Sequence, residues 1–580
     1  MKMEIGMEME IHKNCIRKHF QNLSVKIMSI ISRIMARMYN LPPAETYDIA
    51  VDKNLEVPML DGVVLRANRY YPRHAQNLPT LLVRTPYGRS NFGIVWGLIF
   101  SERGFQVLIQ SCRGTDNSGG EFNPFRGERE DGLATLEWLK TQEWFDGRLV
   151  MTGPSYVGFT QWAIARDAGP MLKAFSTQVT SSEFRSVMYP GGSFNLELFL
   201  GWIQTTYSFK GSILNYLGAM IGAGRRMKAA TSHLPLIKAD EIMVGNPMKF
   251  WREWLQHTEP NDEWWASEDY SHTVAGVSSP NHLISGWYDF LLPQLLRDYT
   301  TLEKAGHTPY LTIGPWAHSS NGFFEVSIRE SLLWLRAHVF GETDNLRTSP
   351  VRIYVMGADE WRDYKTWPPN DTQYKRWYLQ PEAALATDIP PDSDASKFCY
   401  NPRDPTPNVG GAINTTLGRG SGAQDNRKLE ARSDVLVFTS PPLPRDIEVI
   451  GPVSAELFVR SSLEHTDFFV RLCDVHPDSK SMNVCDGLLR LFPGRPVADS
   501  DGCCKVVIDL WPTAHRFKAG HCIRVHVSSG AFPRFSRNLG TGEPLATATT
   551  MKVAEQSIFH DPDHPSAVIL PLTKSKFEYI

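Results

Sequence analysis

The sequence predicts an α/β fold interrupted by a helical insertion and followed by an all-β domain. Compact apolar strands alternate with helical segments, which is the pattern of a parallel sheet with crossover connections. Residues 181–275 break this alternation with Trp, Phe, Met and Leu at helical spacing. Beyond about residue 350, short β-rich segments separated by Pro, Gly, Asp and Asn indicate a β-sandwich or jelly roll.

The N-terminal 44 residues are expected to form an extension built around a basic amphipathic helix. From His12 to Tyr39 the chain carries six Lys or Arg and no acidic residue. The apolar residues that share one face of this helix are Ile27, Ile31, Ile34 and Met38. Such a helix could lie on a membrane, target the chain or pack on a partner. The simpler interpretation is an accessory helix that packs on the domain or is partly disordered.

The elements of the α/β part follow in chain order. Two short strands joined by a turn at Leu60-Asp61-Gly62 come first. Helices are predicted at Asp131–Thr141 and Tyr156–Asp167. The buried strands are predicted at Thr80–Arg84, Phe105–Gln110, Gly147–Thr152, His282–Gly286 and Tyr310–Gly314. Active sites of open α/β sheets gather outside the carboxyl ends of the strands, so residues that follow these strands are candidates for chemistry.

The β-rich part is the last predicted region of the chain. Its strands are predicted at Val351–Val355, Val435–Thr439, Ala455–Val459, Phe468–Leu472, Lys505–Asp509 and Ile523–Ser528. A chain of 580 residues is long enough for several domains. The predicted division is an N-terminal extension at 1–44, an α/β domain at 45–180 and 276–345, a helical cap at 181–275 and a β domain at 350–580.

Composition excludes several classes of protein. A net charge of −3 gives no long-range attraction to nucleic acid. We expect no transmembrane segment, because no run of 18 apolar residues occurs, and no secretory signal. The eight cysteines are scattered without a CxxC pair, which favours free thiols in a reducing compartment and hence a cytoplasmic location. We expect no metal and no other cofactor. The composition leaves open whether the chain forms a homo-oligomer.

A candidate nucleophile stands between a predicted strand and a predicted helix. The segment Gly153-Pro154-Ser155-Tyr156-Val157-Gly158 has small residues that let the chain turn sharply and expose the hydroxyl of Ser155. Val157 occupies the second glycine position of the strict G-x-S-x-G motif, so the match is incomplete. The bland alternative is an ordinary serine in a turn. The strand before it and the helix after it favour a nucleophile elbow.

Two further strand ends supply an acid and a base. Asp289 follows the strand at His282–Gly286, and His318 follows the strand at Tyr310–Gly314. A serine needs a nearby base to act as a nucleophile, and the order Ser, acid, His is the one found in this fold class. The alternatives are a helix cap for Asp289 and a surface position for His318.

Several motifs together resemble the cocaine esterase / X-Pro dipeptidyl-peptidase (S15, CocE/NonD) family, in which position 157 need not be glycine. Gly286-Trp287-Tyr288-Asp289 resembles the family's acid segment, and Gly314-Pro315-Trp316-Ala317-His318 resembles its histidine segment. The resemblance runs from about residue 45 to the end of the chain. The further matching segments are Arg84-Thr85-Pro86-Tyr87, Ser111-Cys112-Arg113-Gly114 with Ser118-Gly119-Gly120-Glu121-Phe122, Val355-Met356-Gly357-Ala358 with Trp361-Arg362, and Phe438-Thr439-Ser440 with Pro441-Pro442-Leu443.

The resemblance implies an α/β-hydrolase core with a helical cap and a C-terminal jelly roll. It also implies catalytic roles for Ser155, Asp289 and His318, and an oxyanion hole formed by the Tyr87 hydroxyl and the Tyr156 N–H. From the residues alone, Tyr87 would be interpreted as an aromatic side chain at the edge of the core. We therefore expect a serine hydrolase that cleaves a small-molecule ester or amide through an acyl-serine intermediate.

Three alternatives to simple ester hydrolysis remain open. The same triad could serve an acyltransferase or cyclase of natural-product biosynthesis, or an X-Pro dipeptidyl-peptidase, or the chain could have lost activity and become a binding protein. A peptidase of this kind needs acidic side chains that hold the substrate ammonium. The candidates are Glu183, Glu197, Asp240, Glu241, Glu253 and Glu259. The aromatic residues of the helical insertion, Trp202, Trp251, Trp254, Trp264 and Trp265, favour a bulky apolar acyl group.

Overall fold

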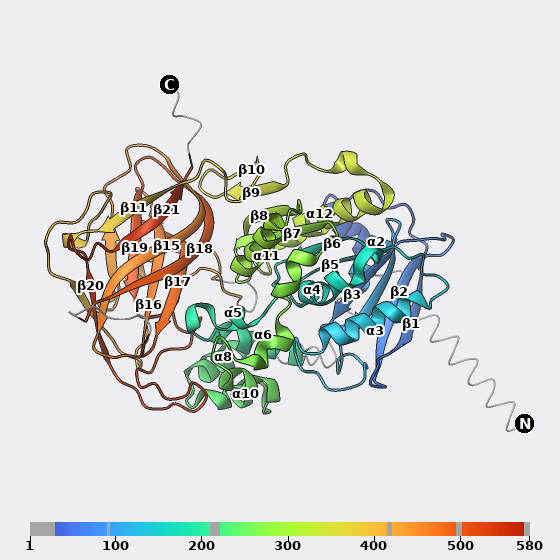
Figure 1. Cartoon of the computed structure of the whole chain (residues 1–580), viewed down its shortest axis with the longest axis horizontal. Coiled ribbons are helices and arrows are strands. Elements are labelled where there is room, and N and C mark those ends of the chain that lie inside the picture. Colours follow the sequence, from blue (N-terminus) through green and yellow to red (C-terminus); the bar gives the residue numbers. More distant parts are fainter. Residues whose placement is uncertain (1–29, 90–92, 209–220, 415–419, 495–501, 574–580) are drawn as a thin grey trace, which may run out of the picture. The chain divides into compact units, whose positions relative to one another are not determined.

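The computed structural model describes residues 30–89, 93–208, 221–414, 420–494 and 502–573 (Figure 1). The chain divides into two compact units. The first unit holds the residues up to Asn123 together with Gly127–Ser176 and Phe324–Leu346. The second unit holds Pro124–Arg126, Thr177–Phe323 and the chain from Arg347 onward.

The first unit is a mixed sheet with helices. Its strands lie in the order β1-β2-β4-β3-β5-β6. β1 pairs antiparallel with β2 across the predicted turn, and β3 pairs in parallel with both β4 and β5. The bounds are β1 Ile49–Pro58, β2 Val64–Pro72, β3 Thr80–Thr85, β4 Gln106–Ser111, β5 Leu149–Pro154, β6 Leu172–Gln178, α2 Gly93–Ser101, α3 Glu128–Lys140, α4 Tyr156–Ala168 and α12 Asn321–Phe340.

The central strands of this unit are buried along their whole length. Every residue of β3, β4 and β5 is buried. Strands covered on both faces tolerate continuous apolar runs, which explains why these segments show no alternation of apolar and polar residues. The predicted strands at Thr80–Arg84, Phe105–Gln110 and Gly147–Thr152 are confirmed to within two residues at each end.

The second unit begins with another set of strands. β7 (Asn281–Tyr288), β8 (Tyr310–Ala317) and β9 (Val351–Val355) pair in parallel, and β10 (Glu360–Tyr364) pairs antiparallel with β9. Helix α11 (Leu292–Lys304) connects β7 to β8. The strand predicted at Val351–Val355 forms, and it pairs with β8, where Leu311 lies opposite Val351. A short β-branched strand has the same sequence pattern in either sheet.

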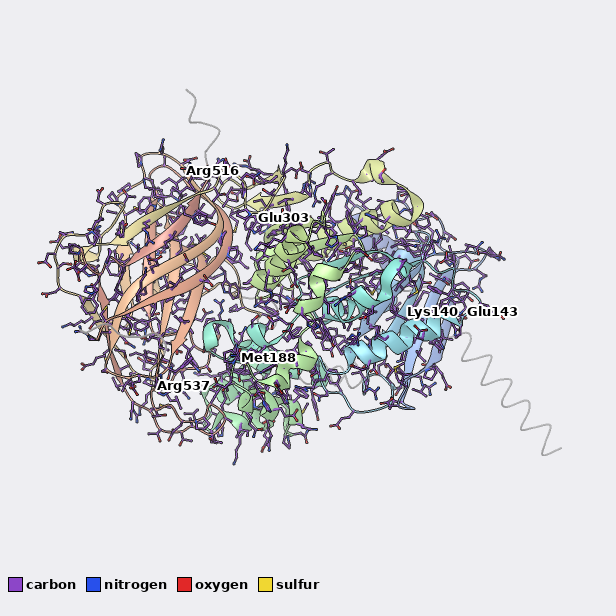
Figure 2. The ribbon with its side chains drawn as sticks, viewed as in Figure 1. Lys140, Glu143, Met188, Glu303, Arg516 and Arg537 are labelled. Carbon is purple, nitrogen blue, oxygen red and sulfur yellow. The ribbon has the colours of Figure 1, made fainter. Side chains whose placement is uncertain are left out.

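The helical cap lies in the second unit and has its own aromatic core. Trp251 and Trp254 are 0% and 1% exposed, and the ring centroids of Phe250 and Trp254 lie 4.9 Å apart. Met188 is the last residue of α5 in this region (Figure 2). The cap elements are α5 Arg185–Met188, η3 Pro190–Gly192, α6 Leu196–Ser208, α8 Ala223–Ser232, η4 Leu236–Lys238, α9 Ala239–Val244, α10 Lys249–Gln256, η5 Glu263–Glu268 and η6 Ser271–Gly276. Trp251 and Trp254 therefore pack in the core of the cap and do not line an open acyl pocket.

The C-terminal β domain consists of two antiparallel sheets, as predicted. Among the described residues, a seven-stranded sheet faces a four-stranded sheet with the order β14-β19-β16-β17. Leu457, Phe468 and Val525 belong to the apolar core of this domain. The strands are β11 Gln373–Leu379, β12 Leu385–Ala386, β13 Ser396–Tyr400, β14 Leu436–Thr439, β15 Ile447–Ser461, β16 Thr466–Val475, β17 Ser481–Leu491, β18 Cys504–Phe517, β19 Cys522–Ser528, β20 Ala554–Phe559 and β21 Ala567–Leu572.

The structure describes the N-terminal helix from residue 30. The face that was predicted to be apolar is largely exposed. Ile34 and Met38 are 52% and 65% exposed. The contact with the core is polar, because the buried hydroxyl of Ser32 donates to Glu102 at 2.7 Å. Ile27 lies outside the described residues. No helix within the described ranges is long and apolar enough to cross a membrane, and the four predicted domain ranges stay predictions.

Gly191 offers a test of how the cap joins the β domain. A Cβ on Gly191 would lie 1.7 Å from the carbonyl oxygen of Leu488 in β17, and its φ is +60°. We expect Gly191→Ala to lower the free energy of unfolding by about 1–3 kcal/mol or more, because a backbone carbonyl cannot move aside easily. Gly245 is a matched control, since its φ is +81° but no atom lies within 4 Å of a Cβ there. Equal losses in the two variants, measured by urea denaturation, would contradict this explanation.

Candidate active site

Ser155 lies at a sharp turn between β5 and α4, and its backbone is strained. Its φ is 58° and its ψ is −125°, a conformation that non-glycine residues rarely adopt. Such strain is typical of functional turns, and the strand–turn–helix context is that of a nucleophile elbow. A Cβ on Gly153 would lie 2.2 Å from Val157 Cγ1, so position 153 must be glycine. Val157 is 2% exposed and fills the space beside Gly153, which explains why valine fits at this position.

A buried ion pair supports the elbow. The hydroxyl of Tyr156 donates to Glu128 Oε1 at 2.7 Å, and Glu128 Oε2 lies 2.8 Å from Arg84 Nη2. The Arg84 and Glu128 side chains are 1% and 5% exposed. Burial, with the Glu128 carboxylate nearby, raises the pKa of the Cys112 thiol well above its ordinary value. Cys112 is therefore a neutral thiol within this cluster.

Tyr87 lies close to the elbow in the same unit. It follows β3, and its N–H donates to Thr85 Oγ1 at 3.1 Å. The rings of Tyr87 and Tyr156 meet edge to face, with centroids 6.5 Å apart and planes at 76°. Tyr156 is the first residue of α4, where backbone N–H groups have no acceptor within the helix. The structure thus brings the Tyr87 side chain next to the residue that follows Ser155.

Asp289 and His318 form a hydrogen-bonded pair in the second unit. His318 Nδ1 lies 2.6 Å from Asp289 Oδ2. The Asp289 side chain is fully buried and that of His318 is 10% exposed. The other carboxylate oxygen of Asp289 accepts the N–H of Leu291 at 2.8 Å, just before α11. The N-cap of α11 is Leu291 and has no side-chain cap, so the carboxylate of Asp289 braces the turn before the helix without capping it.

Aromatic contacts hold the two loops that carry this pair. The ring of Phe290 lies 4.3 Å from that of His318, centroid to centroid. Trp287 Nε1 donates to the carbonyl of Tyr354 at 2.6 Å, and the hydroxyl of Tyr288 donates to the carbonyl of Asn483 at 3.3 Å. The end of β7, directly before Asp289, is thus held by contacts with β9 and with β17. With Nδ1 directed at Asp289, Nε2 is the ring nitrogen that remains for proton transfer.

Four of the six acidic candidates in the cap are engaged within the cap or by its neighbours, whereas the fifth, Glu197 in α6, is a carboxyl whose pKa is raised by burial. Glu183 lies 2.9 Å from Arg297 and Glu241 lies 2.5 Å from Arg252. The buried carboxylate of Asp240 accepts the N–H groups of Glu241 and Met248, and Glu253 lies 3.9 Å from Lys249.

Glu259 is placed differently from these acids. It lines a cavity of about 400 Å³ together with a second acid, Glu543, and with Arg185, Arg490 and Arg537. Three arginines against two acids make this cavity a poor receptor for a substrate ammonium.

The fold also brings together a group that could hold a metal ion. Within the described part of the chain, Asp474, His476 and His521 offer ligand atoms that lie within 4.8 Å of one another. No ligand spacing along the chain signals this group, because His521 lies near the other two only through the pairing of β16 with β19. The buried pair of Arg84 and Glu128 was missed as well. Its only signal is a charged residue, Arg84, near the end of an otherwise apolar strand.

The fold and the elbow define an α/β-hydrolase of the serine type, and the comparisons with known proteins agree. A family model described as X-Pro dipeptidyl-peptidase (S15 family) matches residues 61–320, and one for the X-Pro dipeptidyl-peptidase C-terminal non-catalytic domain matches residues 345–569. Cocaine esterase from Rhodococcus sp. (strain MB1 Bresler) is 33% identical over 572 residues, which cover 90% of this chain and 99% of the esterase. The chain belongs to the S15 family, and this membership makes it a serine hydrolase.

More distant relatives share the fold. A Xaa-Pro dipeptidyl-peptidase from Lactobacillus helveticus (strain DPC 4571) is 22% identical, over 49% of this chain and 37% of that protein. An aminopeptidase from the marine sediment archaeon Thaumarchaeota archaeon superimposes with a TM-score of 0.74 at 22% identity, covering 92% of this chain and 98% of that one. An α-amino acid ester hydrolase gives a TM-score of 0.75 at 22% identity, covering 90% and 97%. The predicted fold class is therefore confirmed.

The ion pair beneath the elbow can be tested by its effect on stability. Glu128→Gln keeps an acceptor for the Tyr156 hydroxyl but leaves Arg84 as a buried, unpaired charge, which costs about 3–5 kcal/mol. Glu137→Gln on the same helix is the matched control. Its partner Lys140 (Figure 2) lies 2.6 Å away and both side chains are more than half exposed, so the expected loss is below about 1 kcal/mol. Chemical denaturation of both variants measures the difference, and similar losses would refute a stabilising role for the buried pair.

Proposed function

We propose that the chain hydrolyses carboxylic esters or amides of small molecules through an acyl-Ser155 intermediate. In this proposal His318 is the general base and acid, and Asp289 holds the imidazole in the tautomer that leaves Nε2 able to accept a proton. The strained backbone of Ser155 between β5 and α4 is the observation that carries the proposal. The 2.6 Å contact between His318 Nδ1 and the buried carboxylate of Asp289 supports the assignment of the base.

The proposed reaction has two steps. His318 Nε2 takes the proton of the Ser155 hydroxyl while Oγ attacks the substrate carbonyl, and the proton then passes to the leaving alcohol or amine as its bond to the carbonyl carbon breaks. Water then attacks the acyl-serine in the same manner, which releases the acid and restores the hydroxyl. The Tyr156 N–H and the Tyr87 hydroxyl are the proposed donors to the negative charge on the carbonyl oxygen.

An ester is the substrate class that we propose over an X-Pro peptide. The relative at 33% identity that matches nearly the whole chain is a cocaine esterase, whereas the Xaa-Pro dipeptidyl-peptidase match spans 37% of that peptidase. Glu183, Asp240, Glu241 and Glu253 are already engaged by cations or backbone N–H groups of this chain. A site for a substrate ammonium would need an acid without such a partner.

The proposed setting of the reaction is the cytoplasm. Five of the described cysteines, Cys112, Cys399, Cys473, Cys485 and Cys522, are free thiols, and free thiols persist in reducing compartments. Size-exclusion chromatography of the purified chain tests the expectation that it can form a homo-oligomer.

The direct test of the nucleophile is Ser155→Ala. We expect turnover of p-nitrophenyl esters to fall by about 10⁴–10⁶-fold, because the acyl-enzyme can no longer form. Ser193→Ala is the control, since Ser193 is a buried serine whose hydroxyl donates to the carbonyl of Ser536 in the β domain. A panel of esters and X-Pro amides run in parallel decides the substrate class. Ester turnover near the wild-type rate in Ser155→Ala, with an unchanged melting midpoint, would exclude the assignment.

The oxyanion role of Tyr87 is tested by Tyr87→Phe, which removes the hydroxyl and keeps the edge-to-face contact with Tyr156. The loss of one oxyanion donor costs about 2.7–4 kcal/mol, or about 10²–10³-fold in kcat, with a much smaller change in KM. A purely structural tyrosine would give lower thermal stability with a nearly normal kcat. Measuring kcat, KM and Tm on one preparation separates the two roles, and a kcat within about threefold of wild type contradicts the oxyanion role.

A further inference from the structure

The end of the four-stranded sheet in the β domain carries a cluster of histidines around one buried aspartate. In β16 and the turn after it, Asp474 and His476 are two residues apart and therefore lie on the same face. β16 pairs antiparallel with β19, and Val475 lies opposite Cys522. Extending this register by one residue places His521 opposite His476 on that same face. The cluster is thus a consequence of strand pairing.

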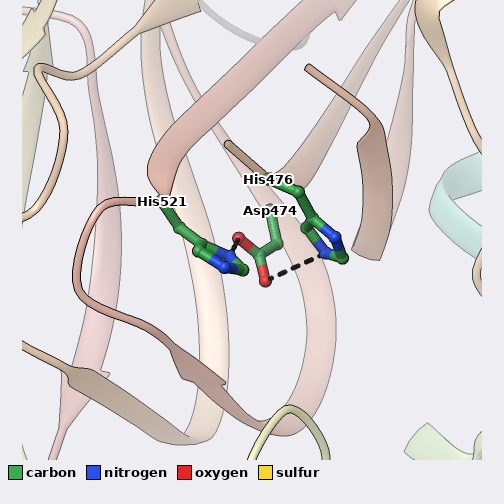
Figure 3. Close-up of side chains that lie close together, drawn as sticks. All are labelled: Asp474, His476 and His521. Carbon is green, nitrogen blue, oxygen red and sulfur yellow. Dashed lines mark hydrogen bonds and ion pairs between the residues drawn. The ribbon is translucent and has the colours of Figure 1, made fainter. Parts of the chain in front are cut away.

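The side chains converge on the carboxylate of Asp474 (Figure 3). His521 Nδ1 lies 2.8 Å from Asp474 Oδ1, and His476 Nε2 lies 3.8 Å from Asp474 Oδ2. The imidazole rings of His476 and His521 have centroids 4.7 Å apart. The Asp474 and His521 side chains are 3% and 13% exposed, whereas that of His476 is 39% exposed. The group is therefore largely shielded but can be reached from one side.

We propose that Asp474, His476 and His521 bind a divalent metal ion of the first transition row or Zn²⁺, and Zn²⁺ is the ion used to test the site. Two imidazole nitrogens and one carboxylate oxygen are a donor set that suits such ions. Bonds of about 2.0–2.1 Å in a tetrahedral site put ligand atoms about 3.3 Å apart. The three ligand atoms already lie within 4.8 Å of one another, so small side-chain rotations suffice. When His521 Nδ1 and Asp474 turn from their mutual contact to the metal, the ring proton of the neutral imidazole is carried on Nε2, so the ligand stays a neutral histidine.

A second histidine layer orients the carboxylate. His515 Nε2 in β18 lies 3.0 Å from Asp474 Oδ2, and the His515 side chain is 12% exposed. Outer partners of this kind fix the ligand carboxylate and are a regular feature of metal sites. The neighbouring Arg516 (Figure 2) pairs with Glu448 at 2.7 Å, so its charge is already balanced.

The site opens into a cavity of about 580 Å³ that reaches the loops of the Asp289–His318 pair. His476, His515 and His521 line it on one side, and Tyr288 and Ala317 line it on the other. Three protein ligands leave a coordination position for water or an anionic group from this cavity. The site goes beyond the proposed hydrolysis, since a serine mechanism requires no metal. The competing explanation is a closed hydrogen-bonded network around Asp474 that takes up no ion.

The test uses the full chain, stripped with EDTA and desalted. Isothermal titration with Zn²⁺ is expected to show about one equivalent bound per chain, and Co²⁺ is expected to give the visible ligand-field bands of a low-coordinate site. His476→Ala and His521→Ala should each weaken Zn²⁺ binding by at least about 100-fold, and His476→Cys should retain it because a thiolate is also a zinc ligand. His74→Ala is the control, because that side chain is 85% exposed and lies elsewhere; its binding should equal that of wild type.

The outcomes are distinct. Uptake far below one equivalent, or uptake that is unchanged in both His476→Ala and His521→Ala, overturns the site. The His476 side chain is part-exposed in a turn, so His476→Ala is expected to fold, and its Tm without metal checks this. Ester turnover of the stripped protein is expected to equal that of the untreated protein. A turnover that requires metal would contradict the serine mechanism, while binding itself would still support the site.

Discussion

The hydrogen bond between His318 and the buried Asp289 is the interaction on which the proposed chemistry depends. An imidazole that presents Nε2 to a substrate needs Nδ1 held by an acceptor, and a carboxylate free of solvent holds it most firmly. At 2.6 Å the contact is short, as expected of a charge-assisted bond. Leu291 donates to the second oxygen of Asp289, so the buried carboxylate is satisfied on both sides.

Much of the second unit serves to hold this pair. Trp287 is anchored on β9 and Tyr288 on β17, and Phe290 packs on the His318 ring. The β domain therefore also supports the position of this pair, through the contact between Tyr288 and β17. It contacts the end of β7 just before Asp289, and the histidine cluster around Asp474 lines the cavity that Tyr288 also lines. A bound metal ion would stiffen the strand ends that line this cavity.

The sequence could predict the features that depend on local order. The elbow at Ser155, the strands before Asp289 and His318, and the helical insertion were all found from apolar runs and turn residues. The features that depend on pairing between distant segments could not be predicted from the sequence. Val351–Val355 pairs with β8, three of the cap tryptophans (Trp251, Trp254 and Trp265) are buried in its core, and His521 lies near Asp474 only through the register of β16 and β19. The Arg84–Glu128 pair likewise requires two elements to meet, and no spacing along the chain signals it.

The central claim is that Ser155 is a nucleophile activated by His318. Labelling of the full chain with a fluorophosphonate, followed by peptide mass spectrometry, tests it most directly, because the reagent traps a serine only when a base has activated it. The account predicts a single adduct on Ser155, formed far more slowly in His318→Ala. An adduct on another serine, or labelling of Ser155 at an unchanged rate in His318→Ala, would contradict it.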